Sequence, residues 1–422
     1  MKNRKILVFT VALLVSIYFA PDGLAISNLS NPRSTAMGGA YIGLARGVEA
    51  PLWNPANLAL SSKNRYSVNL INFGVGLHNN SFNKSQYDMY NGDSLTTGDI
   101  DDILNSIPGD GLKLFMNTES QILSFASGHI AFSVEAIVCS ELQLDKNFVE
   151  IMFRGNEMDK IYEFDNSDGE AFAVASYNLS GALPLNVSGV KRFSIGATIK
   201  FLQGYGYMKV KNTLGYMSTT IDGLEANGLI NMEYAGSGKG IGFDIGAAAE
   251  INSLWTVSLA FKNIISNIQW NQDATEKFFS FNMDPVTMDI LEDTDTDSLF
   301  KTEEAESLMS KTSSALPAQM HLGVVYNFKK MMFAADYIQG LNKRPGTSRI
   351  PQLAVGMQYD VLPWLPLRTG LAIGGNERFV SACGLGLKLG AFALDFGVSN
   401  RGGFFLSNQH GLNLAVGVGF WF

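Results

Sequence analysis

The sequence is poor in charged residues and in cysteine. Only 17% of its 422 residues are Asp, Glu, Lys or Arg, whereas soluble domains carry roughly 25%. The formal net charge is −8, which argues against a nucleic-acid partner because such proteins present basic patches. The two cysteines, Cys139 and Cys383, lie far apart in strand-like segments. One disulfide could form, but the spacing does not predict it, and we expect two unpaired thiols.

Long apolar runs are also missing after the first 25 residues. No downstream stretch of 18 apolar residues occurs, which excludes a membrane-spanning helix there. The first 25 residues themselves combine a cationic start, an apolar run over 6–20 and the small residues Gly23 and Ala25. This pattern predicts a secretory signal peptide over residues 1–25, removed after Sec-dependent export, and the alternative is an uncleaved membrane anchor.

The usual motifs of catalysis and metal binding are absent. The four histidines have no metal-ligand spacing, and no G-x-S-x-G nucleophile motif occurs. The glycine-rich run over 236–242 lacks the spacing of a phosphate-binding loop. We therefore predict no enzymatic activity and no cofactor. A barrel-embedded hydrolase, whose catalytic residues would meet only in space, is the weaker alternative.

What the sequence does contain is apolar alternation with a period of two. In 192–201 the apolar residues Phe193, Ile195, Ile199 and Phe201 share one strand face. Along this and the other alternating segments, the opposite face carries mostly Gly, Ala, Ser, Asn and Gln with scattered charges, which is too small and too poor in charge for a water-exposed surface. A transmembrane β-barrel shows this inverted pattern, with apolar residues toward lipid and small or polar residues toward the lumen.

The links between the predicted strands are alternately short and long, as in outer-membrane barrels with short periplasmic turns and long outer loops. The short links include 127–129, 251–254, 328–330 and 390–391, and the long ones include 79–118, 143–169, 205–239 and 268–317. We predict an all-β chain whose residues 63–422 form a single antiparallel barrel of about fourteen strands. The predicted strands lie near 66–78, 119–126, 130–142, 170–182, 192–204, 240–251, 255–267, 318–328, 331–340, 350–360, 367–375, 382–389, 392–400 and 411–422.

The last predicted strand ends on aromatic residues. Phe420 and Phe422 follow the alternating residues Leu412, Leu414 and Val416, and aromatic side chains collect at membrane interfaces in such barrels. This ending resembles the C-terminal signal by which the outer-membrane barrel assembly machinery recognises its substrates. We expect Phe420 and Phe422 to act as that signal.

A barrel of this size needs something in its lumen or else forms a wide pore. Fourteen strands about 4.8 Å apart and tilted about 40° give a diameter of roughly 28 Å. Residues 26–62 precede the first predicted strand, do not alternate and are rich in Gly and Ala. We expect this segment to be a hatch in the lumen, with a short helix over Ala40–Ala45 and breaks at Pro51 and Pro55.

One part of the hatch resembles a known superfamily. The run MGGAYIGLARGVEAPLWNPANLA contains Gly38, Gly39 and the triplet Asn54-Pro55-Ala56. It is similar to the N-terminal region of FadL-type outer-membrane channels, in which a Gly/Ala-rich stretch leads to an Asn-Pro-Ala motif before the first strand. The resemblance implies a hatch-plugged, fourteen-stranded barrel in the outer membrane of a Gram-negative-type bacterium, surrounded by outer-membrane lipids.

The resemblance implies two different functions. FadL-type proteins carry long-chain fatty acids or other hydrophobic compounds, so a hatch-gated channel for a hydrophobic ligand is expected. The same N-terminal pattern also occurs in PorV-like barrels of the type IX secretion system, which implies a scaffold for secretion proteins that transports nothing itself. A third possibility is a purely structural barrel.

A channel for fatty-acid-like compounds would pair the ligand carboxylate with a cation in the lumen. The candidates for ligand binding are Arg192, Lys200, Lys262 and Arg368, with Lys388 also facing the lumen. The alternative is that the lumen cations and carboxylates pair with one another and with Arg46 or Glu49 of the hatch; those carboxylates are Glu135, Asp244, Glu250, Asp336 and Asp395. FadL-type channels open sideways at a kink in the third strand. That strand here, 130–142, has no Pro or Gly to predict a kink.

An acidic outer loop is a candidate metal site. Asp293, Asp295, Asp297 and Glu304 occupy positions 1, 3, 5 and 12 of an EF-hand-like spacing, but Ser298 replaces the turn glycine. Calcium binding is one interpretation of this run. A solvated run of charges is the simpler one.

Overall fold

A computed structural model gives the structure of the chain. It describes residues 29–60, 64–92, 94–287, 290, 299–375, 378–404 and 406–422. The predicted signal peptide over 1–25 lies outside the described residues, and so do Asp293, Asp295 and Asp297 of the predicted calcium loop. No helix in the described ranges is both long and apolar enough to cross a bilayer.

The described strands close into a fourteen-stranded antiparallel barrel, as predicted. Closure comes from the pairing of the last strand with the first, because Val68 lies opposite Phe420 and Leu77 opposite Leu412. The fourteen wall strands all fall on predicted strands. They are β1 (Tyr66–Asn79), β2 (Leu112–Ser127), β3 (Ile130–Leu144), β5 (Asp168–Leu185), β6 (Arg192–Thr220), β8 (Ser237–Glu250), β9 (Trp255–Gln272), β13 (Gln319–Phe328), β14 (Met331–Gly340), β15 (Gln352–Leu362), β16 (Leu365–Gly374), β17 (Arg378–Leu389), β18 (Phe392–Arg401) and β19 (Gly411–Trp421).

The side chains of the wall have the inverted arrangement expected of a membrane barrel. Along β6, Ser194 and Thr198 are fully buried inside, whereas Ile199 and Phe201 are exposed on the outside. Leu414 of β19 is 47% exposed, while its neighbour Asn413 is only 3% exposed. The apolar face therefore points away from the barrel axis, and the polar face is covered by the contents of the lumen.

Aromatic side chains collect at the end of the barrel that carries the short turns. Trp255 begins β9, Phe328 ends β13, and Trp364 lies in the turn between β15 and β16. Their exposed fractions are 42%, 44% and 44%. Such a girdle marks the interface between hydrocarbon and water, so these residues indicate where the short-turn rim meets the membrane.

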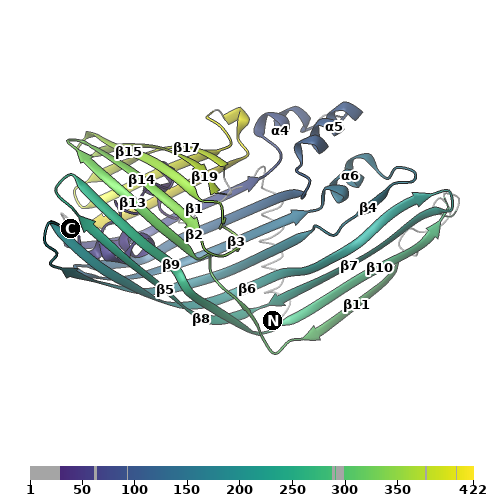
Figure 1. Ribbon diagram of the computed structural model, residues 1–422, viewed down its shortest axis with the longest axis horizontal. Helices are drawn as coiled ribbons and strands as arrows, with labels where there is room; N and C mark the ends of the chain where they lie inside the picture. The colour runs from purple at the N-terminus through teal and green to yellow at the C-terminus, as the bar shows by residue number, and fades with distance from the viewer. Residues whose placement is uncertain are drawn as a thin grey trace.

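The hatch segment consists of short helical pieces inside the barrel. They are α2 (Pro32–Ala36), the 3₁₀ turn η1 (Gly47–Glu49), α3 (Ala50–Trp53) and the 3₁₀ turn η2 (Pro55–Ala59). Most of their residues are buried, and the purple hatch in Figure 1 lies among the strands toward the end that holds the C-terminus. Pro51 and Pro55 stand in the first turns of α3 and η2, where proline fits well.

The predicted helix over Ala40–Ala45 is wrong. These residues form only one turn, in which the N–H groups of Leu44 and Ala45 donate to the carbonyl of Tyr41, and tertiary contacts bind the groups on either side of it. The carboxylate of Asp336 on β14 accepts from the backbone N–H groups of Tyr41 and Ile42 at 2.7 and 2.8 Å. The side chain of Asn57 donates to the carbonyl of Ile42 at 2.6 Å. Tertiary contacts thus override the local preference of this segment.

The long-link side of the barrel is more ordered than a set of loops. Three helices, α4 (Lys84–Tyr90), α5 (Thr97–Ser106) and α6 (Lys146–Arg154), and the short strand β4 (Ile161–Glu163) occupy the first two long links. The prediction of long loops at 205–239 and 268–317 is wrong, because both contain strands. They are the outer part of β6, β7 (Gly223–Ala235), β10 (Thr275–Val286), β11 (Lys301–Leu308) and β12 (Thr312–Ser314).

We call residues 207–220 of β6 together with β7, β10 and β11 the outer sheet. Figure 1 shows it extending past the barrel at the end away from the C-terminus. Strands β6 and β7 form a hairpin in which Thr220 pairs with Gly223. Ile221 and Asp222 form the turn, and Gly223 begins β7 with a φ of +126°, a backbone angle that favours glycine.

Candidate functional site

The Asn-Pro-Ala motif fixes the end of the hatch to the barrel wall. The side-chain amide of Asn54 donates to the carbonyl of Ala247 on β8 at 2.9 Å and to that of Leu259 on β9 at 3.2 Å. Its oxygen accepts from the backbone N–H of Ala56 at 3.0 Å, which caps η2. Asn54 therefore does two tasks at once, since it begins a helical turn and ties that turn to two strands.

Small residues of the wall make room for this motif. The backbone of Ala56 lies against Gly196 of β6, and Asn54 lies against Gly246 of β8, so closely that a Cβ at either glycine would overlap with the hatch. The hydroxyl of Ser194 also donates to the carbonyl of Ala56 at 2.8 Å. The small, polar lumen face predicted from sequence is thus the surface on which the hatch packs.

Gly38 and Gly39 lie where another part of the hatch, away from the Asn-Pro-Ala motif, approaches the wall. Both have left-handed backbone angles, with φ of +64° and +94°, which residues with a side chain rarely adopt. A Cβ on Gly38 would lie 3.1 Å from the backbone nitrogen of Leu371 on β16. The pair therefore allows a sharp turn of the hatch directly against the wall.

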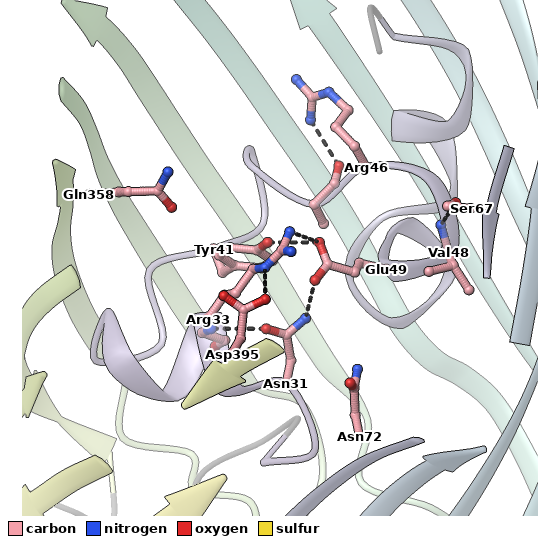
Figure 2. Close-up of polar contacts among 12 residues, drawn as sticks. Asn31, Arg33, Tyr41, Arg46, Val48, Glu49, Ser67, Asn72, Gln358 and Asp395 are labelled. Carbon is pink, nitrogen blue, oxygen red and sulfur yellow. Dashed lines mark hydrogen bonds and ion pairs between the residues drawn. The ribbon is translucent and has the colours of Figure 1, made fainter. Parts of the chain in front are cut away.

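A chain of buried ion pairs links the hatch to the wall, and we call it the latch (Figure 2). Arg33 of α2 binds Asp395 of β18 with a Nε–Oδ2 distance of 2.8 Å and approaches Glu49 of the hatch with a Nη1–Oε2 distance of 3.4 Å. Arg368 of β16 binds the other oxygen of Asp395 at 2.7 Å. One wall carboxylate therefore joins a hatch cation to a wall cation.

Neutral side chains supply the remaining hydrogen bonds of the charged residues in the latch. The hydroxyl of Tyr41 donates to Glu49 at 2.8 Å, and the amide of Asn31 donates to the same carboxylate at 3.3 Å. The side chain of Gln358 accepts from Nε of Arg368 at 2.8 Å. Buried charges need such partners, because an unpaired ion in this environment is costly. Sequence reasoning missed Arg33, although it is one of few charged residues in the hatch.

The predicted ligand-binding cations have different surroundings. Arg368 and Lys200 are both buried and paired, Arg368 with Asp395 and Lys200 with Asp244 at 2.8 Å. This matches the alternative in which lumen charges neutralise one another. Lys262 is 8% exposed and faces a cavity. Arg192 lies at the exposed, short-turn end of β6, so the structure does not bring it to the other three.

A small cavity of about 60 Å³ lies in the lumen, and we call it the inner chamber. The hatch residues Ser30 and Leu52 line it, as do Pro345 and Gly346 of the link between β14 and β15. Its wall combines charge with apolar surface. The charged lining residues are Glu119, Glu135, Lys200 and Lys262, and the larger apolar ones are Leu52, Ile137, Phe172 and Leu316.

Two open cavities of about 560 and 610 Å³ lie on the long-link side, and together we call them the outer vestibule. They share Lys113, Glu141 and Lys343. The link over 341–351 contributes to both cavities and is held by an ion pair of 2.8 Å between Arg344 and Glu170 of β5. Pro345 borders the vestibule and the inner chamber, so this link separates the two spaces.

The barrel wall is irregular beside the inner chamber. Residues 255–262 of β9 pair with β13, and residues 268–270 pair with β12, but no ladder pairs join residues 263–267 to the described segment 315–318. We call this stretch the seam. Asn263 has a left-handed φ of +51° there, and the β8–β9 register shifts at the same place.

Side-chain hydrogen bonds replace the missing ladder at the seam. Asn263 donates to the carbonyl of Pro317 at 2.8 Å, and Ser266 accepts from the N–H of Leu316 at 2.9 Å. The third strand, in contrast, keeps an unbroken register with β5 from Ile130 to Gln143. The strongest interruption near the chamber is therefore on β9, and nothing in the alternation pattern predicted it.

The candidate metal loop is only partly within the described residues. Glu304 lies on β11 and is exposed, whereas its three proposed aspartate partners fall outside. No group of three or more His, Cys, Asp or Glu side chains in the described ranges could hold a metal ion. Calcium binding at this loop stays a prediction.

The two terminal phenylalanines lie on the outside of the barrel. Phe420 contacts Phe392 with a ring separation of 5.6 Å and stacks on Phe422 at 6.1 Å. Phe422 is 61% exposed. Their recognition by the assembly machinery stays a prediction.

Solved outer-membrane transporters share this architecture. The toluene transporter TbuX of Ralstonia pickettii matches with a TM-score of 0.53 and 15% identity, over 94% of this chain and 100% of that chain. The toluene transporter TodX of P. putida matches with a TM-score of 0.55 and 11% identity, over 93% of this chain and 98% of that chain. A FadL homologue of Pseudomonas aeruginosa matches with a TM-score of 0.52 and 13% identity, over 95% of this chain and 100% of that chain. At these identities the likeness establishes the fold.

The sequence comparisons place the chain in a family. No curated protein matches its sequence. The model of the family described as "Family of unknown function (DUF5723)" matches residues 55–236 and 223–398, a range that runs from the Asn-Pro-Ala motif to β18. The chain is thus a barrel of the FadL, TodX and TbuX fold, and it belongs to the DUF5723 family.

Proposed function

We propose that this protein is an outer-membrane channel that passes hydrophobic compounds through a hatch-gated lumen. The observation that carries the proposal is the inner chamber, which lies between the hatch and the link over 341–351. Apolar side chains such as Phe172 and Leu316 line it beside Lys200 and Lys262. An apolar pocket with a few polar groups is the usual form of a small-molecule site.

The chamber is closed in this conformation. Its volume is about 60 Å³, whereas small-molecule sites usually have roughly 300–1,000 Å³. A fatty-acid-like ligand needs more space than this. Passage therefore requires that the hatch, the link over 341–351 or both move. Movement of the hatch must break the latch, and movement of the link must break the Arg344–Glu170 pair.

The proposed path runs from the outer vestibule through the chamber to the seam. The seam is a suitable exit because it borders the chamber through Asn263, Leu316 and Pro317. It also lacks the backbone ladder that closes the rest of this wall. Two side-chain hydrogen bonds are easier to break than a continuous ladder, and Ile264 and Ile265 are exposed at the seam.

Lys262 is the proposed first contact for a polar or acidic ligand group, and Lys200 becomes a second contact when the ligand displaces Asp244 from it. The Nζ atom of Lys262 lies 6.0 Å from the centre of the Trp53 ring in the hatch. A ligand that binds Lys262 therefore also lies beside the hatch. Arg368 is part of the latch instead, and Arg192 lies at the short-turn rim.

We also propose that the protein lies in the outer membrane of a Gram-negative-type bacterium after removal of residues 1–25 by the export machinery. Phe420 and Phe422 would then be read by the barrel assembly machinery.

Extraction and mass spectrometry of lipids from the purified protein test this function. The wild type should carry a fatty acid or another hydrophobic compound, and Lys262→Met should lower its occupancy several-fold. Lys330→Met, in an exposed turn between β13 and β14, is the matched control and should leave the occupancy unchanged. An empty wild-type protein that also fails to take up labelled fatty acid or toluene would contradict the proposal.

The filled lumen supports a second candidate, a PorV-like scaffold that does not transport. The hatch packs against many wall strands, and only the small inner chamber separates it from the link over 341–351. A scaffold needs no through-path. Liposomes that contain the protein would then show no uptake of hydrophobic compounds even when the latch is broken by substitution, whereas a channel would show increased uptake.

A further inference from the structure

The outer sheet continues far beyond the membrane-spanning part of the barrel. Strand β6 alone has 29 residues, whereas a tilted strand needs about 9–11 to cross a bilayer. Its first residues lie at the short-turn rim, so residues 207–220 and the strands paired with them lie outside the hydrocarbon. The side of this sheet that continues the lipid-facing surface therefore faces water or another molecule.

That outward side of the outer sheet is largely apolar. Lys209 lines the vestibule, so its neighbours Met208 and Val210 lie on the opposite face of the strand. Directly paired residues share a face, and the pairing carries this face across β7 and β10. Its apolar members, besides Met208 and Val210, include Ile230, Met232, Tyr234 and Phe279, and Lys277, which pairs with Met232, shares this face. Leu299 and Phe300 pack only at the far tip, where Phe300 meets Phe281 at 5.8 Å.

The outermost strand of this sheet, β11, has a free edge in the described part of the chain. It pairs with β10 from Lys301 to Leu308 and with no other described strand. All eight of its residues are exposed. The edge therefore presents unpaired backbone donors and acceptors, which can extend a sheet by accepting one more strand.

The charge of β11 selects the kind of strand that can be added. Glu303, Glu304 and Glu306 outnumber Lys301. Lys301 is paired with Asp284 of β10, and Lys277 of β10 forms an ion pair of 3.5 Å with Glu306. In the antiparallel register that centres two copies of β11 on each other, Glu303 of each copy faces Glu306 of the other. Like charges placed opposite one another destabilise a sheet, so a second copy is a poor occupant.

We propose that the free edge of β11 is a docking site for an extended, lysine- or arginine-rich strand of a protein partner outside the cell. The partner strand adds to the outer sheet through backbone hydrogen bonds, and its basic side chains lie beside Glu304 and Glu306. The rest of the partner covers the apolar face around Met232 and Phe279. This docking function is independent of whether the lumen conducts.

Charged edge strands also protect a protein from unwanted pairing, and the test separates that role from docking. The probes are three dye-labelled ten-residue peptides. The first alternates Lys and Val, the second alternates Glu and Val, and the third repeats the first with N-methyl groups on every second backbone nitrogen. Fluorescence anisotropy measures their binding to the full-length protein in detergent, and hydrogen–deuterium exchange reports protection of residues 301–308.

The Lys/Val peptide should bind saturably and slow the exchange of β11, whereas the other two should not. The double variant Glu304→Lys/Glu306→Lys should weaken binding at least tenfold. The matched control Asp222→Lys, at the exposed hairpin tip of the same sheet, should change it less than twofold. Heat-modifiable electrophoretic mobility establishes that each variant is folded. Absence of binding, or binding without protection of 301–308, would overturn the proposal.

Discussion

Arg33 in the hatch lies 2.8 Å from Asp395 in the wall, although 362 positions separate them in the chain. The same carboxylate holds Arg368 at 2.7 Å. Any outward movement of α2 must therefore separate an ion pair that is almost fully shielded from water. The position of the hatch therefore depends on these ion pairs as well as on packing.

Substituting Asp395 should release the hatch more strongly than substituting Arg33. Asp395→Asn leaves both Arg33 and Arg368 without their shared anion, whereas Arg33→Met leaves Asp395 paired with Arg368 and Glu49 with its two neutral donors. Breaking a buried pair from one side costs roughly 3–5 kcal/mol. Channel recordings in planar bilayers should show more frequent opening in the order wild type, Arg33→Met, Asp395→Asn. The reverse order would show that the latch does not hold the hatch.

Asn54→Ala should loosen the end of the hatch. The change removes the cap of η2 and two hydrogen bonds to the wall, and losing an N-cap alone costs about 1 kcal/mol. Hydrogen–deuterium exchange of residues 55–60 should become at least fivefold faster. Asn252→Ala, which removes a similar cap in the exposed turn before β9, is the control and should leave these residues unchanged. Equal exchange in both variants would refute the anchoring role.

Gly196→Ala should push the hatch away from the wall. The added methyl would overlap with the backbone of Ala56, and overpacking of this kind costs about 1–3 kcal/mol. The control is Gly181→Ala on β5, where no atom of the described residues lies within 4 Å of the new methyl. Limited proteolysis should cut the hatch faster in the first variant only. Faster cutting in both, or in neither, would contradict close packing of the hatch at Gly196.

Asn263→Gly and Asn263→Val should separate the two roles of Asn263. Glycine keeps the left-handed backbone angle but loses the hydrogen bonds to Lys200 and Pro317. Valine loses both and adds backbone strain of about 1–2 kcal/mol. If the seam is the exit, uptake of a labelled hydrophobic compound should rise in both variants and more in the valine one. Unchanged uptake, with faster exchange at 315–318, would show that the seam opens without serving as the exit.

Deleting residues 29–60 should convert the protein into an open pore. The barrel has an estimated diameter of roughly 28 Å, and the hatch fills much of it. Single-channel conductance should increase several-fold over the full-length protein, with less closing. A folded deletion variant with unchanged conductance would mean that the wall residues or the link over 341–351 seal the lumen without the hatch.

Alternation along the strands predicted most of the barrel. Leu414 and Asn413 illustrate the reason, because consecutive residues of a strand point to opposite faces and only one face can meet lipid. The outer sheet was not predicted, because β11 has the composition of a charged loop and becomes a strand by pairing with β10. The helix expected over Ala40–Ala45 is a single turn, because Asn57 takes the carbonyl of Ile42 that the next helical hydrogen bond would use.

The candidate site was only partly accessible from the sequence. The Asn-Pro-Ala motif and the lumen cations could be named, but their partners could not. Lys200 meets Asp244, and Arg368 meets Asp395 together with Arg33. Which of several carboxylates neutralises a given cation depends on strand register and on the depth of the hatch, and neither is encoded locally.

The sequence by itself determined that this chain forms a barrel with oily residues outside, because burial in lipid imposes a period of two on every crossing strand. It also determined that the segment before β1 packs in a confined space, because glycine and alanine dominate it. Only the tertiary structure decided which charges pair, where the wall loses its ladder and which strand edge stays free. Those features arise from contacts between residues far apart in the chain, and no local pattern records them.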